Sequence, residues 1–507
     1  MPNRHARYDI SPVEFREVDF TRRDDDSDCV NPDPANTVTD RINGLLSSSG
    51  PGYVLRLCPG REYIMQSPIL FAAPGQEIST LGYPTDDSRA TFVVNGPVAN
   101  GAGHTTAVDG TCSSCSNIVL RNVQIDGARR IAPPTSGGAN IEFGGGNSNQ
   151  TIQYVKSYDP RSWSCLHVAE GPFTCNGVVV QNNDIGPCGV DAFQEWADGI
   201  SISCQNAIVR DNVVEGATDG GIVLFGSPGT QVYNNVIRVG NYTQLGGINM
   251  VDYLPWRGNY TNTVVHDNTI FGGFATSPTD GKDTKGTNSN DAIIKIGIAI
   301  GPSTWFGSQY GTNVSFSGAV LHNNMSGAFS YGIAMSSAVN FTVQNNVMSG
   351  NTSFIGAVGP NCSTSDVVPT PAPFVYDSTA ASSTFQKDFV LIPDAKSLTC
   401  VLPPDGGDYW PFGGDPGAGA SLSGSTGTSL SPLPSGQSYS SSDSSTSTSK
   451  ASSTAGVVVG VLAGIAILVV MTWFLRKFMM KRIEDRELYN ASKEYVVGKG
   501  PGYVKQA

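Results

Sequence analysis

Two aspartates in this 507-residue sequence lie where paired carboxyl groups could do acid–base chemistry. Asp198 and Asp219 each precede a glycine and an apolar segment, and they are 219 − 198 = 21 residues apart. If each apolar segment forms one rung of a repeat, the carboxyl groups stack at about 5 Å. A pair at that spacing can act as acid and nucleophile in glycosidic cleavage, and clustered oxygens also bind Ca²⁺. Aspartate before glycine is equally an ordinary turn residue, so both interpretations stay open.

A second set of candidates comes from the alternation of side chains along strands. Segments of the form Gly-Ile-x-hydrophobic, such as Gly199–Ile202, should point their apolar residues inward and the residue between them toward solvent. Extending this register to the neighbouring segments predicts an outward row of Glu142, His167, Ser201, Val223, Asn249, Ala299 and Ala334. A carboxylate, an imidazole and a hydroxyl in one row can bind sugar hydroxyls or transfer a proton. The alternative is that the row is polar only because it faces water.

Two further segments carry aromatic residues that could stack on sugar rings. One is Tyr253–Arg257, and the other contains Trp305, Phe306 and Tyr310, although both could equally cover the side of the repeat. The candidate catalytic residues are therefore Asp198, Asp219, His167 and Glu142. The candidate substrate-binding residues are Ser201, Asn249, Tyr253, Trp256 and Arg257. The sequence predicts no metal-ligand set and no cofactor, apart from the Ca²⁺ that the aspartates could bind.

The elements that would position these residues are repeated. Seven times an apolar segment leads into an asparagine and then another short apolar segment, at Asn122, Asn183, Asn212, Asn235, Asn268, Asn324 and Asn346. The tightest spacings are 235 − 212 = 23 and 346 − 324 = 22 residues. Such a period is typical of stacked coils, and asparagines at one corner can bond to their copies above and below. The sequence predicts an all-β protein, a right-handed single-stranded parallel β-helix, the hand following from the bias of parallel crossovers.

The segment before the repeats predicts a cap. Residues 36–46 favour a helix with Val38, Ile42 and Leu45 on one face, and a Gly-Pro-Gly turn, a strand at 53–57 and Pro59-Gly60 follow. This order resembles the N-terminal cap of the pectin-lyase-like β-helix superfamily. With the repeats, the resemblance covers roughly residues 36–358. It implies a solenoid of parallel strands and an activity on polysaccharide.

The resemblance extends in part to the motifs of polygalacturonase-type glycosidases. Ala197-Asp198-Gly199 is similar to their first Asp motif, and Thr218-Asp219-Gly220 keeps one Asp of their Asp-Asp pair. Their Gly-His-Gly has no counterpart, because residues 245–247 read Leu-Gly-Gly, and Lys295 lacks the preceding Arg of their Arg-x-Lys. A lyase would instead need a basic residue beside an acidic sugar. Arg161, Lys156 and Arg257 are available for that role.

Charge and cysteine usage point to an extracellular protein that does not bind nucleic acid. The net charge is −12, and the residues before 476 carry about −16 because the last 32 hold eight basic and four acidic residues. All ten cysteines precede residue 455, which predicts disulfides in an oxidising compartment, with Cys362 and Cys400 a plausible closing pair of a C-terminal cap. Eight glycosylation sequons lie on the same side. Residues 1–30 contain no signal peptide, which leaves either a chain that starts late or a cytosolic protein with free thiols.

The chain divides into a polar segment 1–30, the β-helix domain with its caps at 31–402, a stalk rich in Ser, Gly, Pro and Thr at 403–454, a transmembrane helix at 455–475 and a cytoplasmic tail at 476–507. Residues 455–475 contain no charge and are long enough to cross a bilayer, and a basic cluster follows them. We expect a single-pass plasma-membrane protein with the β-helix outside. The spacing of Gly456, Gly460 and Gly464 could pair two spans in a homodimer.

These patterns favour a membrane-anchored β-helix that acts on polysaccharide as a lyase or a glycosidase. The competing interpretation is a non-catalytic carbohydrate-binding or adhesion module at the cell surface. The polar row and the aspartates favour the enzyme, and the incomplete glycosidase motifs favour the binding module.

Overall fold

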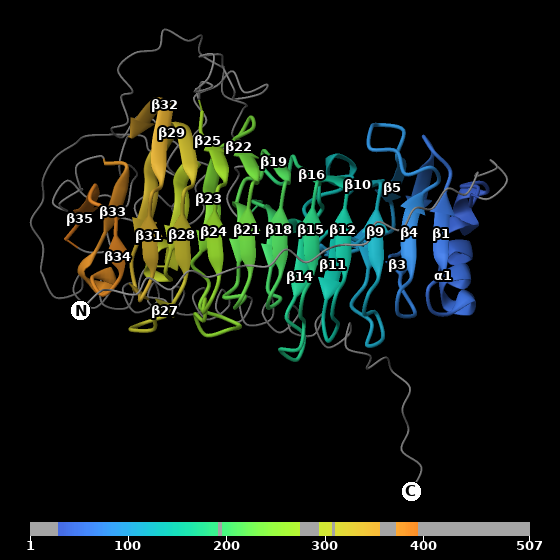
Figure 1. Ribbon diagram of the computed structural model, residues 1–507. Coiled ribbons are helices and arrows are strands. Elements are labelled where there is room, and N and C mark those ends of the chain that lie inside the picture. Colours follow the sequence, from blue (N-terminus) through green and yellow to red (C-terminus); the bar gives the residue numbers. More distant parts are fainter. Residues whose placement is uncertain (1–28, 191–194, 274–293, 307–309, 355–371, 394–507) are drawn as a thin grey trace, which may run out of the picture.

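The computed structural model of this protein describes residues 29–190, 195–273, 294–306, 310–354 and 372–393. The chain winds into a solenoid in which strands of successive coils lie side by side (Figure 1). These strands form three long faces, and the pairings within each face are parallel. The predicted parallel β-helix is therefore the fold observed, as the resemblance to the pectin-lyase-like superfamily implies.

Each coil contributes one short strand to each face. The first face contains β1 (Val54–Leu57), β4 (Glu77–Thr80), β9 (Val119–Arg121), β12 (Thr151–Gln153), β15 (Val179–Gln181), β18 (Ile208–Arg210), β21 (Gln231–Tyr233), β24 (Val264–His266), β28 (Ala319–Leu321), β31 (Thr342–Gln344) and β34 (Thr384–Phe385). The second face contains β2 (Glu62–Met65), β5 (Ala90–Val94), β10 (Val123–Asp126), β13 (Lys156–Tyr158), β16 (Asp184–Ile185), β19 (Val213–Glu215), β22 (Val236–Arg238), β25 (Thr269–Phe271), the start of β29 (Asn324–Met335) and β32 (Val347–Phe354).

The third face carries the predicted site residues. It contains β3 (Ile69–Leu70), β8 (Val108–Asp109), β11 (Ile141–Gly144), β14 (Ser164–Ala169), β17 (Asp198–Ile202), β20 (Gly220–Leu224), β23 (Gln244–Met250), β26 (Ile294–Ile300), the end of β29, β33 (Phe374–Tyr376) and β35 (Phe389–Leu391). The remaining elements are α1 (Val38–Ser49), α2 (Ser303–Phe306), short helical turns at Ala35–Thr37, Arg129–Ile131 and Ser378–Ala380, the pair β27 (Ser315–Phe316) and β30 (Ala338–Val339), and the antiparallel pair β6 (Val98–Ala99) and β7 (Ala102–Gly103).

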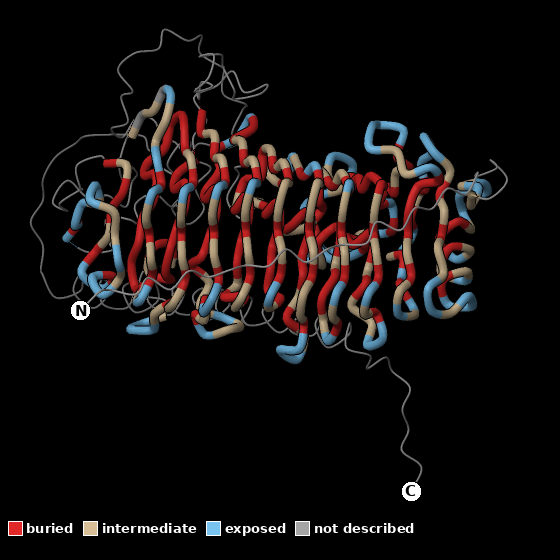
Figure 2. The backbone as a smooth tube through the Cα atoms, in the orientation of Figure 1, coloured by how far each residue is buried: buried red, intermediate tan, exposed pale blue. Residues whose placement is uncertain are grey.

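The core runs along the inside of the solenoid. On the first face most three-residue strands bury only their middle residue, which is Leu120, Ile152, Val180, Val209, Val232, Val265, Val320 or Val343. These residues join the inward residues of the other faces in one hydrophobic cluster. Figure 2 shows the same arrangement, with buried residues along the strands and exposed residues mainly in the connections. Each coil therefore buries its apolar side against its neighbours.

A ladder of glycines explains the Gly-Ile-x-hydrophobic repeats of the third face. Its members are Gly199, Gly221, Gly247, Gly297 and Gly332. A Cβ at any of these positions would lie 2.4–2.8 Å from a backbone carbonyl oxygen of the next coil, for example 2.6 Å from the oxygen of Gly247 if placed on Gly221. No side chain fits at that separation, so glycine is required where the backbones approach.

The predicted asparagine ladder lies at the corner between the first and second faces. Its members are Asn183, Asn212, Asn235, Asn268, Asn323 and Asn346, and each donates from Nδ2 to the Oδ1 of the next at 2.9 Å, up to Asn346. From Asn212 onward, each Oδ1 also accepts the backbone amide of the preceding asparagine, as Asn268 does from Asn235 at 3.1 Å. The ladder satisfies polar groups that the corner would otherwise bury without partners.

Two details of the predicted ladder were wrong. The member in the coil of β28 is Asn323, because Asn324 is the first residue of β29 and is only half-buried. Asn122 does not join the ladder either, since its side chain donates to the carbonyls of Tyr83 and Pro84. It has φ +53° and takes the left-handed position that Asn182, at φ +55°, takes just before its ladder residue. Asparagine is favoured there because it adopts the left-handed backbone conformation more readily than most residues, whether or not it belongs to the ladder.

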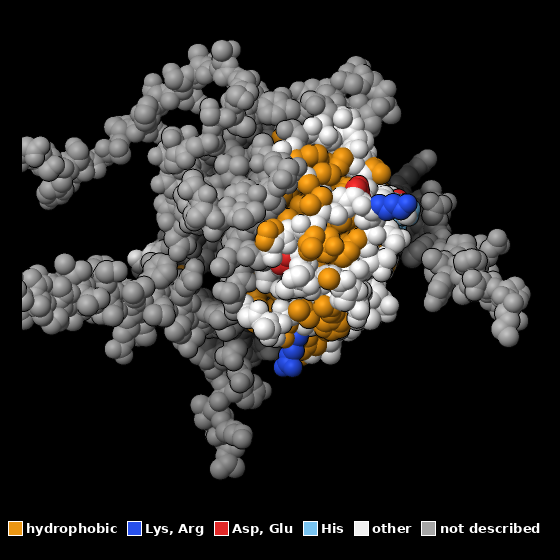
Figure 3. All heavy atoms as spheres, turned by 90° about the vertical axis from the view of Figure 1, so that its left-hand side faces the viewer, with side chains coloured by type: hydrophobic (Ala, Val, Ile, Leu, Met, Phe, Trp, Pro, Cys, Tyr) orange, Lys and Arg blue, Asp and Glu red, His pale blue; other side chains and the backbone are white. Residues whose placement is uncertain are grey.

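The predicted N-terminal cap is present. Helix α1 buries Val38, Ile42 and Leu46 and packs against β2 and β3. Leu46 is therefore the fully buried leucine of the apolar face, whereas Leu45 is only partly buried against the core. At the other end of the described chain, β33, β34 and β35 continue the stack, and hydrophobic side chains cover the end of the solenoid (Figure 3).

All eight cysteines of the described residues form disulfides. The pairs are Cys29–Cys58, Cys112–Cys115, Cys165–Cys188 and Cys175–Cys204. The predicted Cys362–Cys400 pair, the stalk, the span at 455–475 with its glycines, and the tail lie outside the described residues. Within the part of the chain that is described, no helix is long and apolar enough to cross a membrane.

Candidate functional site

The predicted outward row lies on the third face in the expected register. Neighbouring members are paired coil by coil, from Glu142 and His167 through Ser201, Val223 and Asn249 to Ala299 and Ala334. The register adds Asp109 of β8, which is paired with Glu142. Ala299 and Ala334 belong to a small hydrophobic cluster separate from the main core. The face is thus polar toward β8 and apolar toward the later coils.

Glu142 and His167 form a hydrogen-bonded pair across two coils. The Nδ1 of His167 lies 2.7 Å from the Oε2 of Glu142, whose Oε1 accepts the backbone amide of Ala139. The imidazole is 6% exposed and lies edge-on to the rings of Trp163 and Phe225. In the neutral ring, donation from Nδ1 to the carboxylate leaves Nε2 as an acceptor, whereas in the protonated ring both nitrogens donate. Among the described residues Nε2 has no hydrogen-bond partner, so it is available to a ligand.

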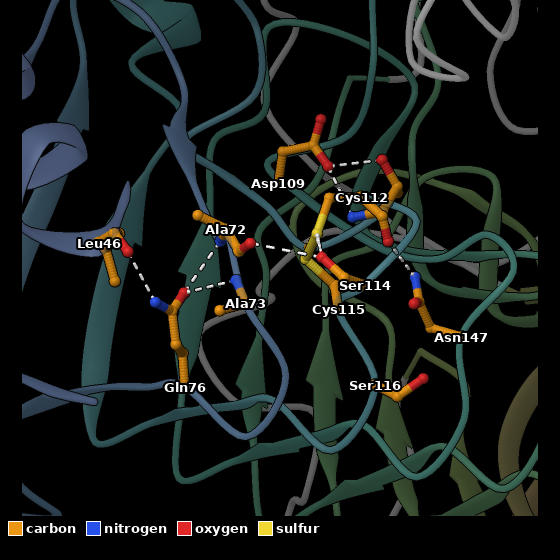
Figure 4. The surroundings of a disulfide bond; sticks show 12 residues. Leu46, Ala72, Ala73, Gln76, Asp109, Cys112, Ser114, Cys115, Ser116 and Asn147 are labelled. Carbon is orange, nitrogen blue, oxygen red and sulfur yellow. Dashed lines mark hydrogen bonds between the residues drawn. A yellow bond between two sulfur atoms is a disulfide. The ribbon is translucent and has the colours of Figure 1, made fainter. Parts of the chain in front are cut away.

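Asp109 lies at the start of the row, beside a disulfide. Its Oδ1 accepts the backbone amide and the hydroxyl of Thr111, at 2.8 and 2.7 Å. The same loop contains the Cys112–Cys115 disulfide, and Asn147 donates to the carbonyl of Cys112 (Figure 4). Burial and the charge of Glu142 raise the pKa of Asp109. The two hydrogen bonds from Thr111 hold the carboxyl in place within its own loop.

Asp198 begins β17 and is held on both carboxylate oxygens. Its Oδ2 accepts the hydroxyl of Ser201 at 2.9 Å, and its Oδ1 accepts the amide of Gly220 at 2.9 Å. The hydroxyl of Ser201 also lies 3.0 Å from that of Ser164 on the preceding coil. Burial raises the pKa of Asp198 well above its usual range, and the charges of Asp219 and Asp252 raise it further. This aspartate is a strand residue rather than the turn residue of the alternative interpretation.

The charges of Asp219 and Asp252 act on Asp198, and we refer to the three residues as the acidic cluster. Asp219 directly precedes β20, and Asp252 follows β23 by two residues. Both side chains are half-buried. Burial raises the pKa of Asp219 to about 6. Burial and the charge of Asp219 raise the pKa of Asp252 to about 8.

The predicted stack of Asp198 on Asp219 was wrong by one residue. Ile200 pairs with Ile222, so Asp198 is aligned with Gly220, and Asp219 lies one position earlier. The two carboxyl groups still influence each other, as the pKa of Asp198 shows. The residue that sequence reasoning missed is Asp252, which belongs to the segment before Tyr253–Arg257. Its place directly after the strand of Asn249 was the only available signal.

Two glycines let the side chains of Val223 and Asn249 lie close to the backbone beside the acidic cluster. A Cβ on Gly220 would lie 2.9 Å from the Nδ2 of Asn249 and 3.2 Å from the Oδ1 of Asp198, and a Cβ on Gly246 would meet the Oδ1 of Asn249. The side chain of Asn249 therefore leans back over these glycines toward Asp198. Its Oδ1 accepts the indole N–H of Trp305 at 3.0 Å. Its Nδ2 has no partner among the residues described.

Aromatic side chains lie at both ends of these strands. Trp163 and Trp196 precede β14 and β17, and Phe225 follows β20. Trp256 reaches back from the loop after β23, donating to the carbonyl of Ser203 at 2.6 Å and packing against Phe173. All but Phe173 are half-buried. The outer side of the third face thus has polar groups in its middle and aromatic rings along its edges.

The remaining predicted residues have mixed placements. Ser201 is fully buried and Asn249 is 3% exposed, so the serine hydroxyl is not open to solvent. Tyr253 is half-buried against Tyr310, whereas Arg257 is exposed. Trp305 is 5% exposed and covers the apolar part of the face, so for this residue the covering role is the correct one.

Two of the three basic residues available to a lyase, Arg161 and Lys156, are engaged elsewhere. Arg161 is 3% exposed and donates to the carbonyls of Gly96 and His104. Lys156 belongs to β13 on the second face, where it pairs with Asp87 at 3.4 Å. No group of three acidic, histidine or cysteine residues in the described part of the chain is placed to hold a metal ion.

Several solved structures are similar to this chain. The chain is similar to an alginate lyase from Paenibacillus sp. str. FPU-7, with 13% identity over 62% of this chain and 95% of that chain and a TM-score of 0.38. It is similar to an exopolygalacturonase from Thermotoga maritima, with 13% identity over 70% of this chain and 85% of that chain and a TM-score of 0.39. It is also similar to a DFA-IIIase from Arthrobacter chlorophenolicus A6, with 14% identity, coverages of 71% and 93% and a TM-score of 0.41.

No family model matches the sequence, and neither does any curated protein. Identities and TM-scores at this level say nothing about activity. The function therefore has to be inferred from the residues of the third face.

Proposed function

We propose that this protein hydrolyses glycosidic bonds of a polysaccharide that lies across the outer side of the third face. The observation that carries the proposal is the acidic cluster of Asp198, Asp219 and Asp252. These residues belong to three successive coils. Burial raises the pKa of all three, and the charges of neighbouring aspartates raise the pKa values of Asp198 and Asp252 further. Carboxyl groups with separated pKa values are what glycoside hydrolysis requires, because one must give a proton while another accepts one.

The pKa values assign the roles. Asp252, with a pKa of about 8, keeps its proton at neutral pH and is the general acid toward the leaving oxygen. Asp219, with a pKa of about 6, is ionised there and acts as the base or the nucleophile. Asp198 is fixed by Ser201 and Gly220 and positions the other two through its charge or its proton.

The rest of the face is suited to holding a glycan chain. Half-buried Trp163, Trp196, Phe225 and Trp256 flank the polar row, and such rings stack on the apolar faces of sugars. Successive coils are about 4.8 Å apart, so an extended polymer along the row meets a new set of groups at each coil. His167 and Asn249 bring further polar atoms to the same side.

We further propose that the β-helix works outside the cell, anchored by residues 455–475. The support is the uncharged 21-residue stretch with its following basic cluster, together with four disulfides in the β-helix. Protease added to intact cells should release or degrade the β-helix. An untouched β-helix on such cells would contradict this orientation.

The hydrolase proposal is tested by incubating the β-helix with a panel of neutral and acidic polysaccharides and measuring new reducing ends and unsaturated products. Asp219→Asn and Asp252→Asn should abolish release of reducing ends. Asp211→Asn is the matched control, because Asp211 carries the same group in a left-handed corner position away from the third face, where asparagine is well tolerated.

A second candidate function is non-catalytic binding of a glycan. It is favoured by the internal hydrogen bonds of Asp198 and the complete burial of Ser201, which leave these groups little freedom to react. A binding module would retain glycans without any product. The same panel separates the two functions, since only the hydrolase produces reducing ends.

A further inference from the structure

We infer that the glycan recognised on the third face carries no carboxylate groups. The inference rests on the proposed function and specifies the substrate class of the same site. Five carboxyl side chains belong to this face or to the ends of its strands. Asp109, Glu142 and Asp198 are strand residues, Asp219 directly precedes β20, and Asp252 follows β23 by two residues. Asp252 keeps its proton at neutral pH, so repulsion comes from the carboxyl groups that are ionised there, Asp219 among them. A polyuronate lying along the row would bring its own negative charges against these groups, and like charges at such separations repel.

Basic side chains do not offset this charge. In the described strands of the third face the one lysine or arginine is Lys295, which is 1% exposed and cannot meet a polymer. Arg161, in the loop before β14, is also buried and donates to backbone carbonyls. Arg257 is exposed in the loop after β23, so of the three described basic residues named for this face only this one is open to solvent.

The loop between β10 and β11 contains two arginines that are already paired with carboxylates. Arg129 lies 3.2 Å from Glu195, and Arg130 binds Asp126 at 2.7 Å and Asp159 at 3.1 Å. A carboxylated sugar would have to displace these partners. Recognition of uronates in proteins depends on free arginine or lysine groups, since the charge must be matched.

Two buried polar groups point to hydroxyls instead. The Nε2 of His167 and the Nδ2 of Asn249 have no partner in the described structure, although both side chains are more than nine-tenths buried. Nε2 of the neutral ring accepts a hydrogen bond, and Nδ2 donates one. A hydroxyl satisfies either group. A carboxylate accepts from Nδ2 as well, but it cannot donate to Nε2 of the neutral ring.

The test measures binding to the Asp252→Asn variant, which we expect to be inactive. Asp252 keeps its proton at neutral pH, so this substitution changes the charge of the site little. Isothermal titration at about pH 7 compares oligosaccharides of neutral β-glucan, α-glucan and xylan with oligogalacturonate and oligomannuronate, at about 20 mM and about 300 mM salt. A neutral oligosaccharide should bind with a Kd that salt leaves unchanged. Uronates should bind at least about tenfold more weakly, and high salt should reduce the difference.

Charge variants provide a second readout. Glu142→Gln combined with Asp219→Asn should improve uronate binding severalfold. Asp211→Asn should not, because Asp211 lies at the corner between the first and second faces. The inference is overturned if a uronate binds as tightly as the best neutral oligosaccharide, or if none of the oligosaccharides binds. Cleavage of a polyuronate would refute it while leaving the hydrolase proposal standing. Binding of neutral glycans without cleavage by the unmodified protein would refute the hydrolase proposal and leave this inference standing.

Discussion

Asp198 and Ser201 face each other on the outside of β17, with the serine hydroxyl donating to the aspartate Oδ2 over 2.9 Å. Strict alternation would place residues three apart on opposite sides of a strand. They meet because the alternation is broken between Gly199 and Ile200: a Cβ on Gly199 would point into the core against Val214, and Ile200 is itself a core residue. The glycine ladder therefore creates the outward position of Asp198 as well as the close packing of the coils.

This contact predicts different outcomes for two substitutions of Asp198. Asp198→Asn keeps one oxygen acceptor for the amide of Gly220, so folding should be preserved while turnover falls by about tenfold or more. Asp198→Ala leaves that amide without its partner and should lower the free energy of unfolding by about 1–3 kcal/mol. Urea unfolding and initial rates measured on both variants check this. Equal activity in Asp198→Asn and the unmodified protein would exclude a role for Asp198.

The raised pKa of Asp252 predicts how stability depends on pH. The folded protein holds this proton up to about pH 8, whereas the ordinary pKa is 3.8, so the favourable contribution is complete below 3.8 and is lost as pH rises through about 8. Asp252→Asn cannot ionise. As pH rises from 3.8 to about 8, the free energy of unfolding of this variant should therefore fall less than that of the unmodified protein. The difference should be on the order of 1 kcal/mol after solvent screening.

Thermal unfolding at a series of pH values measures this difference, with Asp211→Asn as the control. Asp211 is paired with Arg210 at the surface corner and should leave the pH dependence unchanged. Parallel curves for the unmodified protein and Asp252→Asn would show that Asp252 is not held protonated by the fold.

Most of the fold could be predicted from the sequence because the constraint is periodic. A coil that buries its apolar side fixes which residues face outward, so the row from Glu142 to Asn249 followed from the register of a few segments. The two adjacent asparagines at 323 and 324 allowed a slip of one residue, since either one fits the pattern. Only the corner hydrogen bonds decide between them.

The site was less predictable because it depends on the connections. Asp252 lies beyond the end of β23, where the chain leaves the repeat and no period constrains its path. Trp305 likewise returns over the face to bond Asn249, which cannot be deduced from its spacing. The aspartates flanking regular strands were found, and the one in an irregular loop was not.

The asparagine ladder predicts a large cost for removing one of its members. Asn235→Ala deprives Asn212 of its acceptor and leaves the carbonyl of Val209 without its side-chain donor. Both groups are buried, so the free energy of unfolding should fall by about 2–4 kcal/mol. Asn234→Gly is the matched control at the neighbouring position, where φ is +55° and glycine adopts the backbone conformation without strain. A change of similar size in both variants would remove the special role of the ladder.

The glycine ladder makes a comparable prediction on the third face. Gly221→Ala would place a Cβ 2.6 Å from the carbonyl oxygen of Gly247, so two coils must separate. Chemical denaturation should show a loss of about 2 kcal/mol or more. Gly44→Ala in α1, where nothing lies within 4 Å, should instead be neutral or gain up to about 1 kcal/mol. Full stability of Gly221→Ala would mean that the coils can separate at little cost.

The central claim is tested most directly by the initial rate of reducing-end release from a cleaved polysaccharide as a function of pH. Asp219 must be ionised and Asp252 protonated, so the rate should rise through about pH 6 and fall through about pH 8. Asp219→Asn and Asp252→Asn should each lower the rate at the optimum by about 10²–10⁴-fold, and Asp211→Asn should leave it unchanged. Rates that neither aspartate substitution alters, or products with unsaturated ends, would contradict hydrolysis by the acidic cluster.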